Sequence, residues 1–457
     1  MESRPIVVVS NRGPRSFRLT DDGVEPGAPA GGLARGLRPL IERTGGMWIA
    51  CAVSDADRAA ARLDDPDPGI DLRLLDIDPA IYGPAYDTIA NGTLWFAHHG
   101  LWDLPRRPRF DAAWHQAWAA YEAFNERVAD AVAQYAPEGA AVLVQDYHFA
   151  LVGQMVAERR PDLAAVHFSH TPFGGPESIG VVPRAAAETY LRGMAAHAAC
   201  GFHTHRWRRR FEQSCTDFGV VPPPTYVSPL PPDIDGITEL AGAPACDERV
   251  RRIREAVGDR RLILTSGRLE LSKNLQRGLL AYEALLAERR DLHDRVVFAA
   301  FVYPSREGLV DYQAYRQECE GTAARINQRF GTAGWSPVWF DTDDDLPRSI
   351  AGLRLYDVLL INPVRDGLNL VAFEGPLVNE ADGVVVLSTE AGASEQLRDI
   401  ALDVHPFDLV DTTAAIATAL DMDPDQRAQR STRARAIARS RTIDDWFDAQ
   451  LAPLSDR

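Results

Sequence analysis

Short apolar runs, most of them rich in valine, isoleucine and leucine, recur along the chain, and each ends at polar residues or glycine. Between them lie stretches with helical periodicity, such as residues 275–288. Buried strands that alternate with helices are typical of parallel sheets covered on both faces, so the pattern predicts an α/β fold of doubly wound domains. The predicted strands span residues 5–10, 141–145 and 164–168 in the first half, and 262–266, 296–302, 357–361 and 383–387 in the second.

A proline-dense segment, residues 220–246, separates the two sets of strands. It shows no helical periodicity and is therefore the best candidate for a linker. We predict two domains, 1–235 and 236–457. Doubly wound domains bind ligands where their strands end at the carboxyl edge of the sheet, so the residues that follow each strand are candidates for the site.

The charge balance excludes some classes of partner. The chain holds 49 Lys and Arg against 65 Asp and Glu, a net charge of −16, which disfavours general binding to nucleic acid or to an anionic membrane. No apolar run approaches the ~18 residues of a membrane span, no leader-peptide pattern is present, and the five scattered cysteines form no CxxC pair. We expect a reduced, cytoplasmic protein in which a local basic cluster holds any anionic ligand.

One lysine, Lys273, stands among 49 basic residues, and the other 48 are arginine. Codon bias explains the scarcity of lysine but not its position. A predicted strand runs into Gly267 and Arg268, and Lys273 follows just before an amphipathic helix. Two cations and a helix N-terminus at the carboxyl edge of a sheet suit a diphosphate. The alternative is an ordinary loop between a strand and a helix, with solvated charges.

A second motif, Val364–Glu374, directly follows another predicted strand. Asp366 and Glu374 are carboxylates that can accept two hydrogen bonds from vicinal hydroxyls, so both are suited to bind a sugar. Gly367 between them permits a close approach of the backbone to a ligand. An N-cap role for Asp366 is the competing interpretation.

In the first domain, polar residues again follow the strands. Asp146 ends one predicted strand and His170 lies just beyond the next. A glycine pair, Gly31 and Gly32, precedes a helix and would let backbone N–H groups reach a phosphate, although this signal is weak alone. The histidines at 98 and 99, and at 203 and 205, are too close along the chain to share one ion readily, so we predict no metal site.

Nine short motifs follow one another along the chain: SNRGP at 10, GGLA at 31, LW at 94, DYH at 146, HTPF around 170, GFHT at 201, GRLELSKN at 267, PSR at 304 and VRDGLNLVAFE at 364. Taken in order, these motifs resemble those of trehalose-6-phosphate synthases, over about residues 5–454. The resemblance implies the GT-B fold, with two Rossmann-like domains facing across a cleft. It assigns the acceptor to domain 1–235 and the nucleotide sugar to domain 236–457, and it implies that the last helix, about 440–457, crosses back to the N-terminal domain.

The same resemblance implies the roles of the site residues. Arg268 and Lys273 would clamp the donor diphosphate, Asp366 would hold the donor sugar hydroxyls and His170 would lie near the sugar O6. The implied donor-binding residues are Gly32, Gly367, Leu368, Asn369, Leu370 and Glu374, and the implied acceptor-binding residues are Arg12, Tyr86, Trp95, Asp146 and Arg306. The chemistry would be a retaining front-face substitution, in which the nucleotide sugar is a substrate and neither a cofactor nor a metal is needed.

Some positions depart from the synthases. Glu270 and Leu271 stand where the synthases carry Asp-Tyr, Phe373 stands in place of a lysine, and residues 46–51 lack a second tryptophan that borders the acceptor. The segments HHGLWD, FEGPLVNE and HPFDLVD look more like the pseudo-glycosyltransferase branch, which makes validoxylamine A 7′-phosphate. That branch lacks the arginines of RDG and PSR, and both are present here.

We therefore predict a glycosyltransferase that moves glucose from a nucleotide-diphosphate glucose to a phosphorylated acceptor, foremost glucose 6-phosphate, to give trehalose 6-phosphate. The alternatives are transfer of a nucleotide-linked cyclitol to a phosphorylated aminocyclitol, and glucosyl transfer to another acceptor such as glycerol 3-phosphate. A regulatory paralogue that binds nucleotide sugar without turnover is a further alternative. The sequence leaves open the nucleobase and the oligomeric state, a homo-oligomer included.

Overall fold

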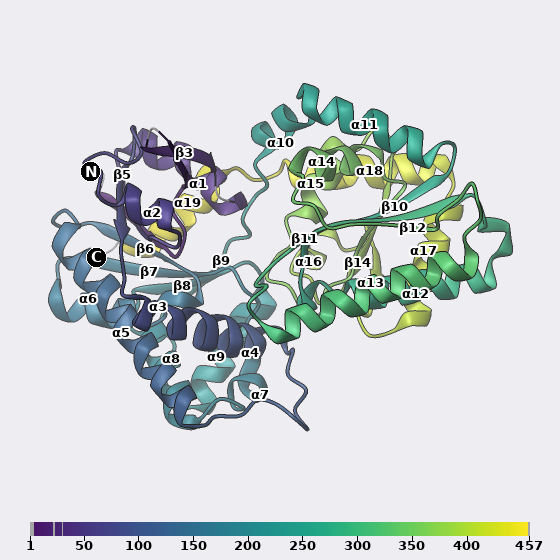
Figure 1. Ribbon diagram of the computed structural model, residues 1–457. Helices are drawn as coiled ribbons and strands as arrows, with labels where there is room; N and C mark the ends of the chain where they lie inside the picture. Colours follow the sequence, from purple (N-terminus) through teal and green to yellow (C-terminus); the bar gives the residue numbers. More distant parts are fainter. Residues whose placement is uncertain (1–3, 22, 30, 456–457) are drawn as a thin grey trace. The chain divides into compact units, whose positions relative to one another are not determined.

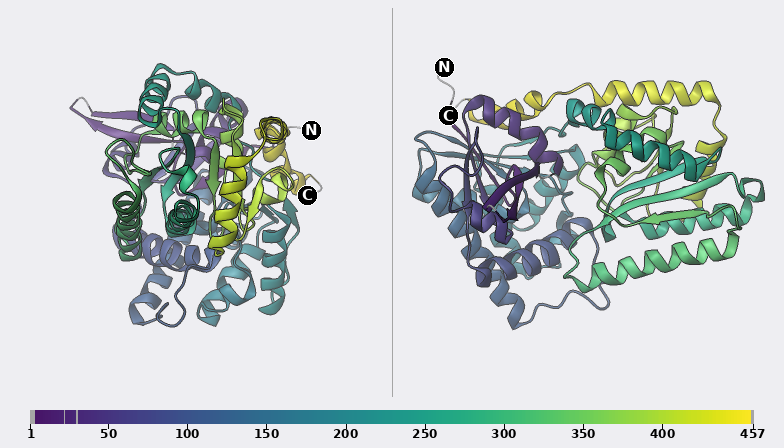
Figure 2. Two further views of the ribbon diagram at one scale, coloured as in Figure 1. Left: turned by 90° about the vertical axis from the view of Figure 1, so that its right-hand side faces the viewer. Right: turned by 45° about the horizontal axis from the view of Figure 1, so that its top comes forward.

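The computed structural model describes residues 4–21, 23–29 and 31–455. The chain forms two compact units, of which the first is Met1–Leu230 together with Thr442–Arg457 and the second is Pro231–Arg441. Each unit is built on one parallel sheet with helices on both faces (Figures 1 and 2). The predicted α/β class with doubly wound domains is confirmed.

The sheet of the first unit has the strand order β5-β4-β1-β6-β7-β8-β9, and every neighbouring pair is parallel. All of the residues of the central strands are buried, as their apolar, β-branched sequences predict. A separate antiparallel hairpin joins β2 and β3. The strands of this unit are β1 (Ile6–Ser10), β2 (Arg15–Thr20), β3 (Gly23–Pro29), β4 (Met47–Cys51), β5 (Asp71–Leu75), β6 (Ala141–Gln145), β7 (Ala164–Ser169), β8 (Ala199–Phe202) and β9 (Thr225–Val227).

The helices of the first unit include one long π-helix, η1, and end with a segment from the C-terminus of the chain. They are α1 (Gly31–Thr44), α2 (Asp55–Ala60), α3 (Pro79–Gly83), η1 (Pro84–Leu94), α4 (Trp95–His99), α5 (Ala112–Tyr135), η2 (Tyr147–Phe149), α6 (Val152–Arg159), α7 (Gly175–Ile179), α8 (Arg184–Ala195), α9 (His205–Asp217), α19 (Ile443–Leu451) and η5 (Ala452–Leu454).

The second unit has a six-stranded sheet in the order β12-β11-β10-β13-β14-β15. Its strands are β10 (Arg261–Leu269), β11 (Val296–Pro304), β12 (Val338–Asp341), β13 (Val358–Ile361), β14 (Val384–Ser388) and β15 (Leu402–Val404). Its helices are α10 (Ile234–Ala241), α11 (Pro244–Val257), η3 (Leu271–Lys273), α12 (Leu275–Glu288), η4 (Arg290–Leu292), α13 (Val310–Phe330), α14 (Leu346–Leu355), α15 (Val371–Val378), α16 (Ser394–Leu397), α17 (Leu409–Asp421) and α18 (Pro424–Ala438).

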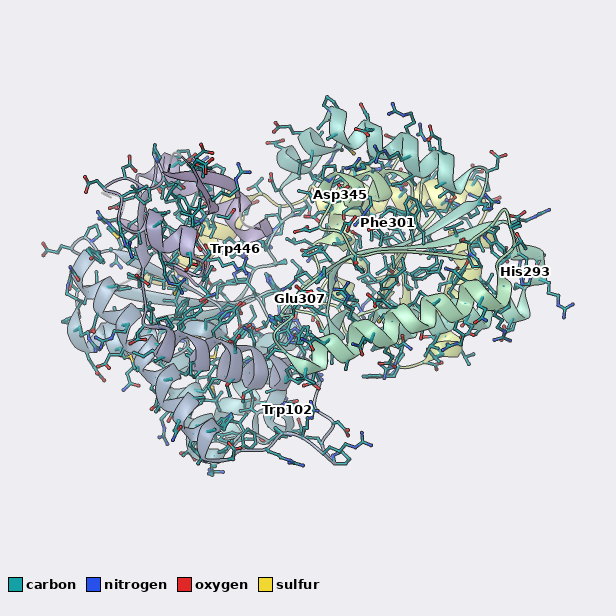
Figure 3. All side chains as sticks on the ribbon, in the orientation of Figure 1. Trp102, His293, Phe301, Glu307, Asp345 and Trp446 are labelled. Atoms are coloured by element: carbon teal, nitrogen blue, oxygen red, sulfur yellow. The ribbon has the colours of Figure 1, made fainter. Side chains whose placement is uncertain are left out.

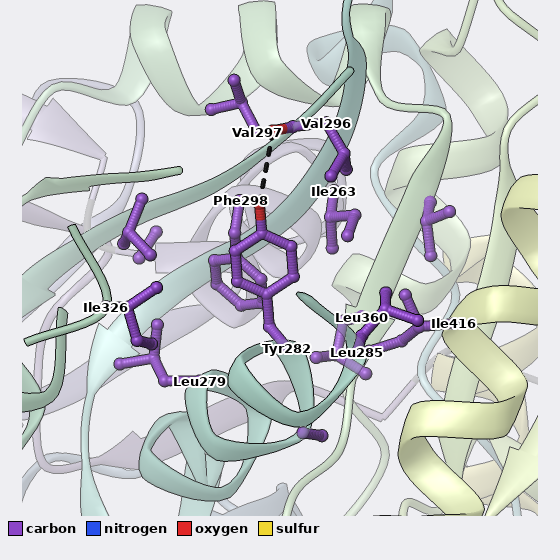
Figure 4. Packing of buried hydrophobic residues seen from close by; sticks show 14 of the residues in the cluster. Ile263, Leu279, Tyr282, Leu285, Val296, Val297, Phe298, Ile326, Leu360 and Ile416 are labelled. Carbon is purple, nitrogen blue, oxygen red and sulfur yellow. Dashed lines mark hydrogen bonds between the residues drawn. The ribbon is translucent and has the colours of Figure 1, made fainter. Parts of the chain in front are cut away.

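The core of the second unit lies between the sheet and the helices α12, α13 and α17 (Figure 4). Tyr282 of α12 is fully buried against Phe298 of β11. Its hydroxyl donates to the carbonyl oxygens of Val296, at 3.3 Å, and Pro337, at 3.1 Å. A buried tyrosine needs such a partner because an unpaired hydroxyl is costly away from water.

The C-terminal helix α19 packs onto the first unit through Trp446, which Figure 3 labels. Trp446 is fully buried and meets the ring of Phe168 edge to face, with the centroids 4.9 Å apart. Beside it, the side chain of Gln145 donates to Gln450 of α19 at 3.2 Å. The helix therefore reaches the end of β6, next to the residues predicted to bind substrate.

The predicted strands are all present. The linker candidate, residues 220–246, contains helices although its sequence shows no helical periodicity. Helix α10 lies inside that segment and α11 begins in it. The side chain of Asp233 accepts from the backbone N–H of Gly236 and caps α10, and Pro244 occupies the first turn of α11, where its missing N–H has no cost. Within the described ranges, no helix combines the length and hydropathy that a membrane crossing requires.

Candidate active site

Of the two predicted clamp cations, Arg268 is the next-to-last residue of the central strand β10, and Lys273 lies in the loop that follows this strand. At the end of this strand, Gly267 has a φ of +140°, which glycine adopts without strain, and Arg268 follows it. Asn274 then takes a left-handed conformation, with a φ of +61°, and its amide donates to the carbonyl oxygens of Asn362 and Pro406 at 2.8 and 2.7 Å. These bonds hold the loop that carries Lys273 at the carboxyl edge of the sheet.

Lys273 lies against the second predicted motif. Its Nζ donates to Oδ2 of Asp366 at 2.5 Å, and the amide of Asn369 donates to the same oxygen at 3.0 Å. The backbone N–H of Val364 donates to the carbonyl of Ser272 at 2.8 Å and joins the two loops. The structure therefore brings together a cation suited to phosphate and a carboxylate suited to sugar hydroxyls.

The backbone from Gly367 to Leu370 is held in place before α15 begins. The N–H of Ala393 donates to the carbonyl of Leu368 at 2.8 Å, and Asp366 forms an isolated parallel bridge with the segment that follows β14. A Cβ at Gly392 would lie 2.0 Å from the carbonyl oxygen of Gly367, so only glycine fits there. Glu374 is partly buried in the first turn of α15.

Glu270, which the sequence marked only as a departure from the synthases, is the centre of the charged group at this edge. Its side chain is fully buried, and Oε1 accepts from Nη1 of Arg268 at 2.9 Å, Nη1 of Arg306 at 3.2 Å and the hydroxyl of Ser305 at 3.0 Å. Burial alone would raise the pKa of Glu270, but the surrounding cations, Arg268 first, lower it to about 2. The carboxylate is therefore charged at any physiological pH.

Arg306, predicted from the resemblance to bind the acceptor phosphate, thus lies beside Arg268 of the predicted donor clamp. It follows β11 with a φ of +51°, and its Nη1 also donates to the hydroxyl of Tyr312 at 2.8 Å. The signal that could have found this group is the acidic residue between two basic motif positions, since a fully buried carboxylate needs cations.

In the first unit, Asp146 and His170 meet at the ends of β6 and β7. Oδ1 of Asp146 accepts from the backbone N–H groups of His170, at 3.2 Å, and Thr171, at 3.3 Å. Burial nevertheless raises the pKa of Asp146 to about 6. Asp146 has a φ of +70°, so its backbone turns away from the strand direction at the point where a ligand is expected.

His170 is neutral at pH 7, because burial lowers its pKa well below the usual value. Its Nε2 lies 2.9 Å from Oε1 of Gln145, so the proton is assigned to Nε2 and this nitrogen donates. The ring also packs against Trp446 and His203, with centroid distances of 5.8 and 5.3 Å. The imidazole is therefore held as a neutral hydrogen-bonding group.

The two aromatic residues predicted at the acceptor lie in the π-helix η1 and directly after it. Tyr86 lies inside it and stacks on Tyr82 and His148, with centroids 5.2 and 5.7 Å apart. Trp95 follows it and stacks on His99 at 3.8 Å. Segments of π-helix are rare and mark functional sites in many proteins, which fits the predicted place of both rings. His148 is a member of this stack to which the sequence assigned no role of its own.

Arg12 and Gly32 complete the predicted set. Arg12 is exposed, and its carbonyl accepts from the hydroxyl of Ser10 at 2.6 Å. The side chain of the adjacent Asn11 donates to the hydroxyl of Tyr82 at 3.2 Å, so the loop that carries Arg12 lies beside the aromatic stack. Gly32 belongs to the first turn of α1, but its surroundings lie outside the described residues. Among the described residues, no three His, Cys, Asp or Glu side chains are grouped to hold a metal ion.

Comparisons with known proteins identify the family of this chain. Residues 4–456 match the model of glycosyltransferase family 20. A trehalose-6-phosphate synthase of Mycobacterium sp. (strain KMS) is 32% identical, and the match covers 98% of this chain and 95% of the relative. A validamine 7-phosphate valienyltransferase of Streptomyces hygroscopicus subsp. jinggangensis is 30% identical, and the match covers 89% of this chain and 85% of the relative.

A solved structure of a related synthase supports the same family. The UDP-forming α,α-trehalose-phosphate synthase of Burkholderia xenovorans was solved in complex with glucose-6-phosphate. Its structure matches this chain with a TM-score of 0.85 at 27% identity, and the match covers 98% of this chain and 99% of the synthase. The predicted GT-B fold is thereby confirmed for the two units. The chain therefore belongs to glycosyltransferase family 20, the family of the trehalose-6-phosphate synthases that it resembles.

Proposed function

We propose that the chain transfers glucose from a nucleotide-diphosphate glucose to glucose 6-phosphate, with retention, to form trehalose 6-phosphate. The observation that carries the proposal is the hydrogen bond of 2.5 Å between Lys273 and Asp366, with Arg268 on the same sheet edge. A diphosphate at the two cations would bring the attached sugar to the carboxylate. The family relatives support the reaction class, and a related synthase was solved with glucose-6-phosphate bound.

The residues of the second unit act on the donor. Arg268 and Lys273 neutralise the negative charge that grows on the diphosphate as it leaves, and deleting one such contact typically costs ~10²–10³ in rate. Asp366, oriented by Asn369, accepts hydrogen bonds from the sugar hydroxyls. Glu374 at the start of α15 takes the ribose hydroxyls, and the backbone of Gly367–Leu370 contacts the donor.

The residues of the first unit act on the acceptor and on the transferred sugar. Asp146 accepts from hydroxyls of the acceptor, and neutral His170 hydrogen-bonds near the sugar O6. We assign Arg12, Tyr86 and Trp95 to the acceptor phosphate. Arg306 is assigned to the same group, because guanidinium groups match phosphate oxygens as forks. Gly32 approaches the donor phosphates.

The reaction needs no nucleophile from the protein. The bond between the sugar C1 and the phosphate oxygen breaks while the acceptor hydroxyl attacks C1 from the same face. The departing phosphate oxygen takes the proton of that hydroxyl, so the charge balances without a covalent enzyme intermediate. A double-displacement mechanism would instead require a carboxylate nucleophile at C1.

A matrix of donors and acceptors on the purified protein tests the proposal. UDP-, GDP- and ADP-glucose are each combined with glucose 6-phosphate and with glycerol 3-phosphate, and the products are identified by mass spectrometry. We expect release of nucleoside diphosphate only when donor and acceptor are both present, with trehalose 6-phosphate as the product. No release from any of the donors with glucose 6-phosphate contradicts the proposal.

Transfer of a nucleotide-linked unsaturated cyclitol to a phosphorylated aminocyclitol is the second candidate. It is favoured by the 30% identity with a valienyltransferase over 89% of this chain. The same matrix, extended by these two substrates, separates the candidates, because this product joins its rings through nitrogen and resists trehalases and other glycosidases. Turnover of the cyclitol pair alone would replace the first proposal by the second.

A further inference from the structure

The proposed function leaves Glu270 without a role, although it is a fully buried charge at the site. A carboxylate out of water is stable only with close cations or hydrogen-bond donors. Three donors, Arg268, Arg306 and Ser305, converge on the single oxygen Oε1 at 2.9, 3.2 and 3.0 Å. The second oxygen lies 3.5 Å from the hydroxyl of Ser272. Glu270 therefore connects two loops that carry different predicted substrate contacts.

The register of the sheet brings these loops together. Strands β10 and β11 are parallel, and Leu269 pairs with Pro304 at the last position of the ladder. Glu270 comes directly after Leu269, and Ser305 and Arg306 come directly after Pro304. The carboxylate lies at the junction of the two strand ends.

Two guanidinium groups this close to one oxygen repel each other. The charge of Glu270 raises the pKa of Arg268, whereas Arg306 lowers it, so the carboxylate offsets a repulsion between like charges. Without the negative charge, the two arginines would move apart or lose their common orientation. Arg268 is 39% exposed on its side chain and Arg306 is 12% exposed, so Arg268 has the greater room to move.

We propose that Glu270 is a positioning residue that holds Arg268 and Arg306 at one carboxylate oxygen and so sets the spacing between the donor diphosphate and the acceptor phosphate. The inference rests on the proposed function, in which Arg268 contacts the donor and Arg306 contacts the acceptor. Glu270 itself touches neither substrate. Its effect is transmitted through the two guanidinium groups, so it depends on the presence of both.

A set of variants tests the charge separately from the shape. Glu270→Gln keeps the size and an oxygen acceptor but removes the charge, and Glu270→Asp keeps the charge. We expect Glu270→Gln to lower kcat/KM for the acceptor by at least roughly tenfold, since a misplaced contact of about 1 Å can cost ~10² in rate. Glu270→Asp should recover most of this loss. The matched control is Glu283→Gln, because Glu283 also pairs with two arginines, Arg325 and Arg329, but on the helices α12 and α13.

A double-mutant cycle distinguishes positioning from general destabilisation. In the Arg306→Gln background, the further change Glu270→Gln should alter acceptor kcat/KM by less than about twofold, because the positioned partner is already gone. Fully additive losses, or an acceptor kcat/KM for Glu270→Gln equal to that of the wild type, overturn the proposal. Thermal unfolding of each variant reports whether it folds. If Glu270→Gln does not fold, Glu270→Asp carries the test, because it keeps the charge, and a loss of acceptor kcat/KM beyond roughly tenfold in Glu270→Asp overturns the proposal.

A crystal structure of the Glu270→Gln protein gives a readout that needs no turnover. We expect at least one of the two guanidinium groups to have left residue 270, whereas the control variant keeps both in place. Both groups remaining within hydrogen-bond distance of the glutamine overturn the inference. A wild-type protein that acts on no donor and acceptor pair contradicts the proposed function. The crystal structure of Glu270→Gln would still show whether Glu270 holds the two guanidinium groups in place.

Discussion

The variant Lys273→Arg tests whether the reaction requires a lysine at position 273 or whether the only lysine lies there by chance. Nζ of Lys273 lies 2.5 Å from Asp366, and the two side chains are 25% and 16% exposed, so there is little room for a wider, planar group. A guanidinium keeps the positive charge but cannot present it as a compact point to a diphosphate oxygen. We expect at least roughly a tenfold loss of kcat, which corresponds to about 1.4 kcal/mol of transition-state stabilisation.

The loss should appear in kcat more than in the donor KM, because the contact strengthens as charge develops on the leaving group. Steady-state kinetics with the active donor and acceptor pair measure both constants, and urea unfolding shows whether the fold is kept. Lys273→Met, which leaves Asp366 without this cation, should cost about 1–3 kcal/mol of unfolding free energy, whereas Lys273→Arg should cost less.

The matched control is Arg325→Lys, which makes the reverse exchange in a half-exposed ion pair with Glu283 and should change neither activity nor stability measurably. A Lys273→Arg enzyme with the kcat of the wild type would refute the reasoning. The position of the only lysine would then be a matter of codon usage.

Three further predictions concern the first unit and the donor loop. The pKa of Asp146 is raised to about 6, so ionisation of its carboxyl group disfavours the folded state. As the pH rises from about 4 to 7, urea unfolding should therefore show the wild-type protein losing stability relative to Asp146→Asn. Over the same range, kcat/KM for the acceptor should rise through about pH 6 as the carboxylate forms. Trp446→Ala empties a fully buried site and should cost about 3–5 kcal/mol in chemical unfolding, whereas Trp446→Phe should cost clearly less. Gly392→Ala forces a Cβ to within 2.0 Å of the Gly367 carbonyl and should raise the donor KM, while Gly334→Ala, in open space, should leave it unchanged. A flat pH response, equal costs for the two Trp446 variants, or a normal donor KM would each contradict the corresponding argument.

The sequence by itself determined the fold class and the places where chemistry is found. Apolar, β-branched runs such as 141–145 and 296–302 became strands because a strand buried on both faces leaves a continuous local signal. Arg268, Lys273, Asp146 and His170 were found because ligands gather where parallel strands end, and that position can be read locally. The helix α10 was missed because a single side-chain cap and a short apolar face carry little weight among prolines.

The partnerships between these residues were decided only by the tertiary structure. Glu270 and Arg306 are 36 residues apart, and Lys273 and Asp366 are 93 apart. The sequence does not show which of these residues pair, since each contact follows from the register of parallel strands and from loops bonded across the sheet edge. The return of α19 to the first unit likewise depends on the packing of Trp446 over residues that lie hundreds of positions earlier. Local patterns select which residues reach the sheet edge, and long-range pairing selects which of them meet.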